Sequence, residues 1–298
     1  MTRSLITGAD GFVGRHLRAH LLAHGDETFG VDRECDVTDE ASVRGVLDET
    51  RPDVIYHLAA LTRVGESWKH AAEYTRVNVV GTQRVLNSAR EVVPGCTIVI
   101  VSTADVYGVV READLPLTEE FRVAPQSPYA TSKVEAEHVA REAWRRFDQR
   151  VVIARPFNHI GPGQSPSFFV SAIASRLLEA RREGRGEIAV GDLSPRRDVS
   201  DVRDVVRAYA LMAEYAAPGE IYHVASGRDV AMAEIAHALV SLIAPGTALV
   251  QDSSLVRPQE IPVLRGSAEK VHAATGWKGE IGLDETLRDV VASLENLD

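Results

Sequence analysis

Cysteine is scarce in this chain, and the two that it has, Cys35 and Cys96, lie far apart and outside any paired metal-ligand spacing. Small secreted domains held by disulfides are much richer in cysteine, and structural zinc sites pair their cysteines at short spacing. We therefore expect reduced thiols, no metal site and a cytoplasmic protein.

Long apolar runs are missing as well. Residues 1–8 contain no segment of signal-peptide type, and no later run approaches the roughly 20 apolar residues that a membrane-spanning helix needs. We expect a protein that neither crosses nor contacts a membrane.

Basic residues are outnumbered, 33 Lys and Arg against 43 Asp and Glu, which gives a formal net charge of −10. Binding to a nucleic-acid backbone needs a basic face, so we expect no nucleic-acid partner. An anionic small ligand would have to be held by local arginines and helix amino termini, against the sign of the overall field.

What the 298 residues do contain is a regular alternation of short apolar strands with helical patterns, and no internal repeat. Such alternation predicts an α/β fold, a doubly wound parallel (Rossmann) sheet. Strands are predicted at 4–7, 28–31, 54–58, 97–101, 151–154, 187–190 and 221–224. Helices are predicted at 13–24, 71–92, 128–147, 168–182, 202–215, 233–243 and 285–294.

Three glycines, Gly8, Gly11 and Gly14, join the first strand to the first helix. In such a loop the glycines let the backbone turn, approach a pyrophosphate and pack the helix on the strand. The plainer interpretation is a tight strand–helix turn, but the position between a strand and a helix favours dinucleotide binding.

The second predicted strand ends at Asp32, eighteen residues after Gly14. A carboxylate there can accept hydrogen bonds from the adenosine ribose, which favours NAD. The adjacent Arg33 could equally receive the 2′-phosphate of NADP, so both cofactors stay open, with NAD preferred. Asp36 and Val37 follow in a loop that suits an adenine contact or merely caps the next helix.

Tyr129 and Lys133 lie one turn apart on the helix that Pro128 begins, and the same face continues in an apolar stripe to Phe147. A cation beside a phenol favours the phenolate, so we expect Lys133 to lower the Tyr129 pKa and make it an acid–base group. The plainer interpretation is a snorkelling lysine beside a half-buried tyrosine.

Two further segments follow predicted strands at their carboxyl ends, where open α/β sheets bind ligands. Thr103 follows strand 97–101 and offers a hydroxyl, although a threonine often bonds only a local carbonyl. Ala59 and Ala60 follow strand 54–58, and we expect these small residues where the backbone approaches a flat group. His57 is predicted to be a hydrogen-bonded structural histidine.

The ordered motifs resemble the extended short-chain dehydrogenase/reductases, the NAD-dependent epimerase/dehydratase family. The resemblance covers essentially the whole chain, and the distal segments 155–164, 197–206 and 257–262 look most like GDP-4-keto-6-deoxy-mannose reductases and GDP-mannose 4,6-dehydratases. The motifs are Gly8-x-x-Gly11-x-x-Gly14, His57-Leu58-Ala59-Ala60, Asn78-Val79-Val80-Gly81-Thr82, Ser102-Thr103-Ala104-Asp105-Val106-Tyr107-Gly108 and Tyr129-x-x-x-Lys133.

This resemblance implies an enzyme that uses NAD or NADP on a nucleotide-activated sugar, with Thr103, Tyr129 and Lys133 as catalytic residues. It implies a dinucleotide-binding domain at 1–160, rejoined by about 198–226, and a smaller α/β nucleotide-sugar lobe built from insertions at 161–197 and 227–298. The implied cofactor contacts are Gly8, Gly11, Phe12, Val13, Gly14, Asp32, Arg33, Asp36, Val37, Leu58, Ala59, Ala60, Asn78, Tyr129 and Lys133. The implied substrate contacts are Thr103, Ala104, Asp105, Tyr129, Asn158, Phe169, Val170, Arg197, Arg257 and Glu260.

One departure from the family pattern bears on the reaction. Sugar 4,6-dehydratases need an acidic or hydroxyl residue and then glutamate directly after the threonine, and this chain has Ala104 and Asp105 there. We therefore expect reduction of a 4-keto sugar, most like GDP-4-keto-6-deoxy-D-mannose. The alternatives are a 4-epimerase with tightly bound NAD, a 4,6-dehydratase, or a dinucleotide-sensing protein without catalysis. The family likeness also implies a homodimer packed through helices 71–92 and 128–147.

Overall fold

The computed structural model describes residues 1–256 and 261–296, and its centre is a six-stranded, wholly parallel sheet. The strand order is β2-β1-β3-β4-β5-β9, which confirms the predicted α/β class. The inner strands are continuously apolar because helices cover both faces of the sheet. The strands are β1 (Arg3–Thr7), β2 (Glu27–Val31), β3 (Val54–His57), β4 (Thr97–Val101), β5 (Arg150–Pro156) and β9 (Ile221–Val224).

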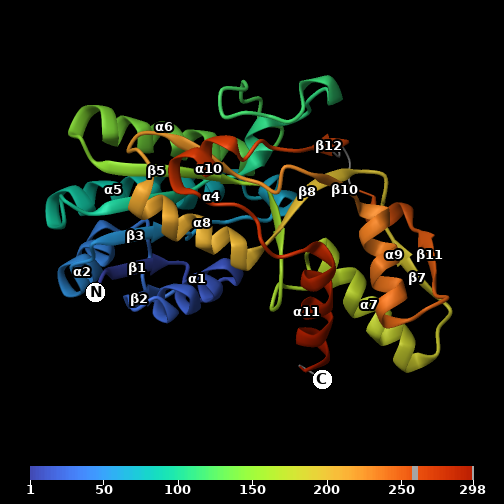
Figure 1. Ribbon diagram of the computed structural model, residues 1–298. Helices are drawn as coiled ribbons and strands as arrows, with labels where there is room; N and C mark the ends of the chain where they lie inside the picture. The colour runs from blue at the N-terminus through green and yellow to red at the C-terminus, as the bar shows by residue number, and fades with distance from the viewer. Residues whose placement is uncertain (257–260, 297–298) are drawn as a thin grey trace.

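Helices α1 (Phe12–Ala23) and α8 (Val202–Tyr215) cover one face of this sheet. The other face carries α2 (Glu40–Thr50), α5 (Gly81–Val92) and α6 (Pro128–Phe147), as Figure 1 shows. The strand order reverses between β1 and β3, so the chain leaves these two strands in opposite directions. The gap that results at their carboxyl ends is where such sheets bind dinucleotides.

The helix predicted over 71–92 is interrupted by a π-helical turn. It runs as α4 (Ala71–Thr75), the π-turn η1 (Arg76–Val80) and then α5. Single π-turns inside α-helices are frequent at functional sites, and this one carries the buried Asn78.

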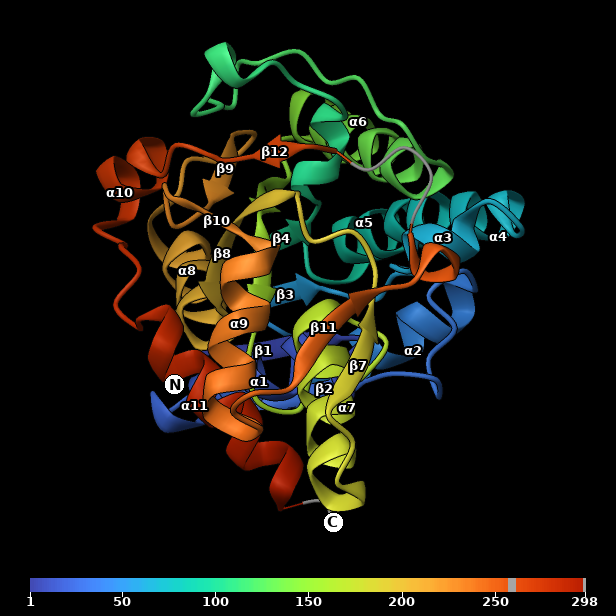
Figure 2. The same cartoon turned by 90° about the vertical axis from the view of Figure 1, so that its right-hand side faces the viewer.

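A second lobe lies beside the central sheet and faces the viewer in Figure 2. Its core is formed by α7 (Phe169–Glu183), α9 (Met232–Ile243) and α11 (Leu283–Glu295), packed with β7 (Glu187–Val190), which pairs with β11 (Ala248–Gln251). A further sheet is centred on β8 (Arg196–Asp201), which pairs with β6 (Asn158–Ile160), β10 (Asp229–Ala231) and β12 (Val263–Leu264). The short helices are α3 (Val64–Ser67), η2 (Ala104–Tyr107), η3 (Glu112–Asp114), η4 (Ser253–Leu255) and α10 (Glu269–Thr275).

Strand β8 contains a charged run, Arg196-Arg197-Asp198, which the sequence analysis did not predict as a strand. Asp198 is fully buried there because its carboxylate accepts four hydrogen bonds from two loops. The donors are the Ser226 N–H and hydroxyl and the N–H groups of Gly227 and Gly266, at 2.7 to 3.3 Å. One carboxylate thus joins the end of β9 to the second sheet.

Strand β9 and helix α8 return the chain to the central sheet after the lobe begins. Val271 and Trp277, near the carboxyl end of the chain, also pack in the core beneath α8. The division into residues 1–160 with about 198–226, and 161–197 with 227–298, stays a prediction.

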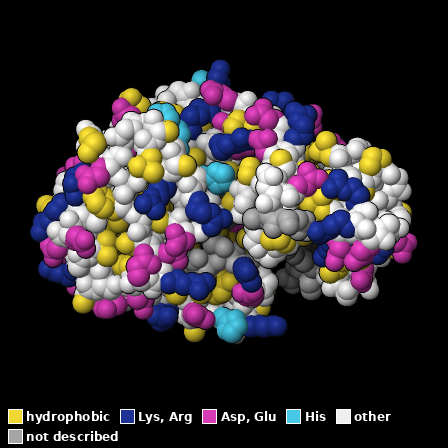
Figure 3. Space-filling view, turned by 90° about the horizontal axis from the view of Figure 1, so that it is seen from below, with side chains coloured by type: hydrophobic (Ala, Val, Ile, Leu, Met, Phe, Trp, Pro, Cys, Tyr) yellow, Lys and Arg dark blue, Asp and Glu magenta, His cyan; other side chains and the backbone are white. Residues whose placement is uncertain are grey.

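Among the described residues, no helix combines the length and apolarity needed to span a membrane. On the face in Figure 3, basic and acidic side chains are interspersed, so neither sign forms a continuous field there.

Candidate active site

The glycine loop after β1 has a geometry that only glycine fits. Gly8 has φ +73°, and a Cβ there would lie 2.9 Å from the Ala59 backbone nitrogen. A Cβ at Gly14 would lie 2.3 Å from the Gly8 carbonyl oxygen, so helix α1 packs directly on the loop. Gly11 precedes the helix without a side-chain cap, which leaves first-turn N–H groups for a phosphate. These features fit a dinucleotide.

The carboxylate of Asp32 lies at the edge of this loop, because its Oδ2 accepts a 3.1 Å hydrogen bond from the Asp10 N–H. The exposed Arg33 follows it. Phe12 and Val13 begin α1, and the Phe12 ring stacks on His159 with centroids 6.3 Å apart. The carboxylate at the loop is thus directly followed in sequence by an exposed arginine, so a residue suited to NAD and one suited to NADP are both present.

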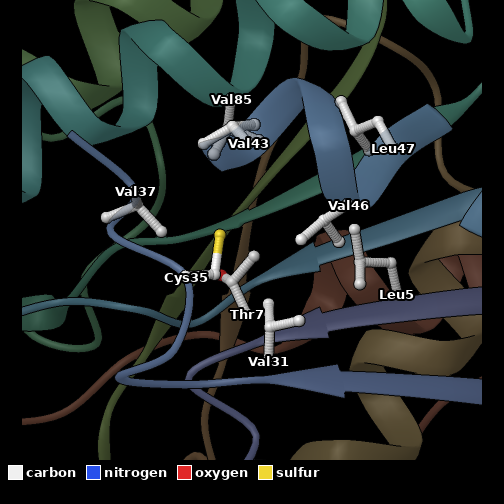
Figure 4. Close-up of a pocket in the computed structure, with 9 residues that line it drawn as sticks. All are labelled: Leu5, Thr7, Val31, Cys35, Val37, Val43, Val46, Leu47 and Val85. Carbon is white, nitrogen blue, oxygen red and sulfur yellow. The ribbon is translucent and has the colours of Figure 1, made fainter. Parts of the chain in front are cut away.

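The loop after β2 caps the next helix, because the Asp39 carboxylate accepts the Ala41 N–H of α2 at 3.1 Å. Asp36 accepts hydrogen bonds from the Thr38 N–H and hydroxyl at 2.9 and 2.8 Å, which lower the pKa of Asp36. Cys35 and Val37 are buried, and both line a small apolar cavity between the sheet, α2 and α5 (Figure 4). Burial raises the pKa of the Cys35 thiol, and Cys35 and Cys96 are both free, so neither is activated.

The wall opposite the glycine loop is formed by Leu58, Ala59 and Ala60 after β3. The Leu58 N–H donates to the Thr7 carbonyl at 3.2 Å, and the Ala59 N–H donates to the Thr7 hydroxyl at 3.2 Å. Asn78 is buried behind them, and its amide bonds Leu61 and Ser132.

The Tyr129 phenol and the Lys133 ammonium are both buried near the start of α6, with residue exposures of 7% each. Ser127 caps this helix by accepting the Ala130 N–H at 3.1 Å, and Pro128 occupies its first turn, as predicted. The stripe beyond Lys133 is buried through Ala143, but Phe147 is 44% exposed. The predicted burial of Phe147 was wrong because the ring lies at the helix end, under the Arg90 guanidinium.

Thr103 and Tyr129, 26 positions apart in sequence, lie close enough for the Thr103 hydroxyl to affect the pKa of the Tyr129 phenol. Burial and the Asp105 carboxylate raise this pKa, and the Thr103 hydroxyl lowers it only partly. The prediction that Lys133 lowers this pKa was wrong for this structure. The reason is that the ammonium donates to the Val101 carbonyl at 2.8 Å, while burial disfavours the phenolate. The phenol is therefore protonated at neutral pH, which is the form that can donate.

Burial lowers the pKa of Lys133 to about 8, against the opposing effect of Glu137. As the pH rises through 8 the ammonium loses its proton, and with it the charged donor that is expected to hold the cofactor ribose beside Tyr129. We expect kcat/KM to fall above about pH 8. Since a guanidinium stays charged, the residual rate of Lys133→Arg should stay flat there. An alkaline limb that is the same in both proteins would contradict this assignment.

The residues after Thr103 lie against the same site. Ala104 is buried, with 2% exposure, and Asp105 lies close enough to raise the pKa of Tyr129. Alanine carries no proton, so this place in the site supplies one acidic side chain rather than two acid–base groups.

The predicted substrate residues lie on several elements of the second lobe. Asn158 is exposed on β6, which pairs in parallel with β8 and its Arg197. Phe169 and Val170 begin α7, and Val170 is buried. The predicted contacts Arg257 and Glu260 lie outside the described residues.

A buried ion pair behind the site was missed from the sequence. Arg155 forms a two-bond pair with Glu137 at 2.6 and 2.8 Å, with side-chain exposures of 5% and 3%. Glu137 also accepts from the Ser102 hydroxyl, and Arg155 donates to the Tyr107 hydroxyl at 2.8 Å. Ser102 and Tyr107 flank Thr103, so the pair fixes the segment that carries it. The available signal was Glu137, one turn after Lys133 on the same buried face.

Comparisons with known proteins find relatives that span nearly the whole chain. A family model described as GDP-mannose 4,6 dehydratase matches residues 33–290. The chain is 35% identical to a GDP-6-deoxy-D-mannose reductase of Pseudomonas aeruginosa, over 99% of this chain and 97% of the relative. A UDP-glucose 4-epimerase of Mycolicibacterium smegmatis is 29% identical over 99% of both. Among solved structures, RMD from Pseudomonas aeruginosa complexed with NADPH superposes with a TM-score of 0.92 and 34% identity, covering both chains fully.

Proposed function

Because this chain belongs to the GDP-mannose 4,6-dehydratase family of extended short-chain dehydrogenase/reductases, we propose that it reduces the C4 ketone of a nucleotide-activated 6-deoxy sugar. GDP-4-keto-6-deoxy-D-mannose is the proposed substrate, in line with the reductase relative. The observation that carries the reaction type is Ala104. It places a methyl group where dehydration would need a proton-transferring side chain, while Thr103 and Tyr129, the two hydroxyl groups that ketone reduction needs, lie near one another.

In the proposed mechanism a bound reduced nicotinamide supplies the hydride. Tyr129 donates its phenolic proton to the oxygen at C4, and the Thr103 hydroxyl bonds the same oxygen more strongly as negative charge builds on it. Lys133 would hold the nicotinamide ribose. Gly8, Gly11 and Gly14 would hold the pyrophosphate, and the Asp32–Arg33 pair supports use of either NADH or NADPH. Asn158 and Arg197 are proposed to contact the sugar diphosphate, with Arg257 and Glu260 proposed from the family pattern alone.

The test is an absorbance assay at 340 nm with NADH and with NADPH against freshly made GDP-4-keto-6-deoxy-D-mannose, with the thymidine and uridine analogues alongside. A reductase consumes reduced cofactor in step with product. A 4-epimerase would convert its sugar with no net absorbance change, and a dehydratase would act on GDP-mannose. Tight cofactor binding without turnover of any of these sugars would favour a sensing protein and contradict reduction.

We also propose a cytoplasmic homodimer. The two buried free thiols fit a reducing compartment.

The proposed dimer interface includes an exposed tryptophan. Trp68 is 60% exposed beside a groove between α4 and the start of α6, and the family likeness implies a dimer packed through these helices. Apolar surface of this kind typically marks a protein interface. Light scattering should give twice the 32.4 kDa chain mass, and a monomer would contradict the proposal. The groove is lined by Trp68, Ala71, Ala72, Thr75, Pro125, Gln126, Ser127, Pro128 and Thr131.

A further inference from the structure

His57 is the centre of a buried chain of hydrogen bonds that the proposed mechanism does not use. Its Nδ1 lies 2.8 Å from the Thr7 hydroxyl, and its Nε2 lies 3.1 Å from the Thr82 hydroxyl. All three residues are at most 4% exposed. The Thr7 hydroxyl also accepts a hydrogen bond from the Ala59 N–H at 3.2 Å, and the Thr82 hydroxyl donates one to the Asn78 carbonyl at 2.7 Å.

The donors and acceptors along these hydrogen bonds allow only one direction of donation. The Asn78 carbonyl can only accept, so the Thr82 hydroxyl donates its single proton to that carbonyl. The Thr82 oxygen must therefore accept a hydrogen bond from the His57 Nε2–H. The Ala59 N–H donates to Thr7. With Nε2 carrying the ring proton, the neutral His57 accepts from the Thr7 hydroxyl at Nδ1. Burial and the nearby Lys133 lower the pKa of His57 to about 3, so the ring is neutral.

Further hydrogen bonds lead from the Asn78 side chain to α6, the helix that carries Tyr129. The Asn78 carboxamide accepts from the Leu61 N–H at 2.8 Å and donates to the Leu61 carbonyl at 3.0 Å, which fixes its orientation. Its remaining N–H donates to the Ser132 hydroxyl at 2.9 Å, and Ser132 donates to the Tyr129 carbonyl at 2.7 Å. Two rows of hydrogen bonds therefore meet at Asn78, one ending at its main-chain carbonyl and one starting at its carboxamide, and together they connect the proposed cofactor wall at Ala59 with the first turn that carries Tyr129.

We propose that His57, held as the neutral Nε2–H tautomer between Thr7 and Thr82, is a positioning residue that couples the cofactor wall to the Tyr129 helix. The inference rests on the proposed function because that function makes Tyr129 the proton donor. The hydrogen bonds themselves do not depend on the proposed function. Without the Thr82 hydroxyl, the Nε2–H would have no acceptor there in a site that admits little water. The ring would then turn or change tautomer, and Ala59 and Asn78 would lose their common anchor.

The first test is the tautomer of the wild-type protein, read from ¹⁵N–¹H correlation spectra of the histidine rings. We expect a neutral His57 with the proton on Nε2 from pH 6 to 8. A protonated ring, or a proton on Nδ1, would overturn the proposal, and neither the substrate nor turnover is needed to see it. His57→Gln identifies the resonance by its loss.

The second test compares Thr82→Val, which keeps the shape and removes the hydroxyl, with Thr82→Ser, which restores it. Small displacements of catalytic groups cost up to about 100-fold in rate. We therefore expect Thr82→Val to lower kcat at saturating cofactor by ~10- to 100-fold and to weaken NADPH binding, measured by fluorescence titration. Thr82→Ser should recover to within about threefold.

Thr50→Val is the matched control, because Thr50 is also buried and also bonds a carbonyl of its own helix, at 2.7 Å to Val46. Both valine variants should lose stability to a similar degree, but only Thr82→Val should change kcat, cofactor affinity and the His57 spectrum. If Thr82→Val changes only stability, His57 is merely structural. If the wild type turns over no sugar, the proposed function fails while the tautomer and the cofactor titrations still test the coupling.

Discussion

Replacing Tyr129 with phenylalanine is expected to lower kcat by about 10²- to 10⁴-fold, the contribution typical of a positioned general acid. The change removes one oxygen, the one that lies near Thr103 and would donate the proton. Tyr129 is 93% buried, and its aromatic ring and packing contacts would remain in the variant. Steady-state oxidation of NADH or NADPH measures the loss, and fluorescence titration should show a cofactor dissociation constant within about twofold of the wild type.

Tyr209→Phe is the matched control for this variant. Tyr209 is fully buried on α8, and its hydroxyl has no hydrogen-bond partner among the described residues. Removing that hydroxyl should leave kcat unchanged and stability equal or slightly higher, because an unpaired buried polar group is costly. Wild-type turnover by Tyr129→Phe, or an equal loss in the two variants, would show that Tyr129 is not the acid.

Replacing Arg155 with methionine is expected to lower the free energy of unfolding by about 3–5 kcal/mol, the range found when one partner of a buried ion pair is removed. The Glu137 carboxylate would then lie 3% exposed, with the Ser102 hydroxyl as its remaining hydrogen-bond partner among the described residues. The Tyr107 hydroxyl would lose the Arg155 donor as well. Urea denaturation measures the change, provided that the slope of the transition stays the same.

An exposed pair supplies the control. Arg44 bonds Glu91 with side chains 41% and 45% exposed, so Arg44→Met should cost less than about 1 kcal/mol. The double variant Glu137→Leu with Arg155→Met should recover part of the loss, since it removes the carboxylate that Arg155→Met leaves without its partner. If Arg155→Met costs no more than Arg44→Met, the buried pair does not stabilise the fold. Because Ser102 and Tyr107 flank Thr103, kcat is expected to fall with stability.

Much of the fold was determined by local sequence. The runs 54–58, 97–101 and 151–154 are apolar and β-branched, and each became an inner strand because that composition fits a sheet covered on both faces. The glycine loop and the one-turn spacing of Tyr129 and Lys133 were equally readable, since backbone freedom and helical period depend only on neighbouring residues.

Only the tertiary structure decided which groups meet and what charge they carry. The sequence could not show that Thr103 lies near Tyr129, that His57 lies between Thr7 and Thr82, or that Arg155 pairs with Glu137. It predicted the wrong direction for the Tyr129 pKa. The physical reason is that desolvation and hydrogen bonding depend on segments far apart in the chain, whereas helical and strand periods are set within a few residues.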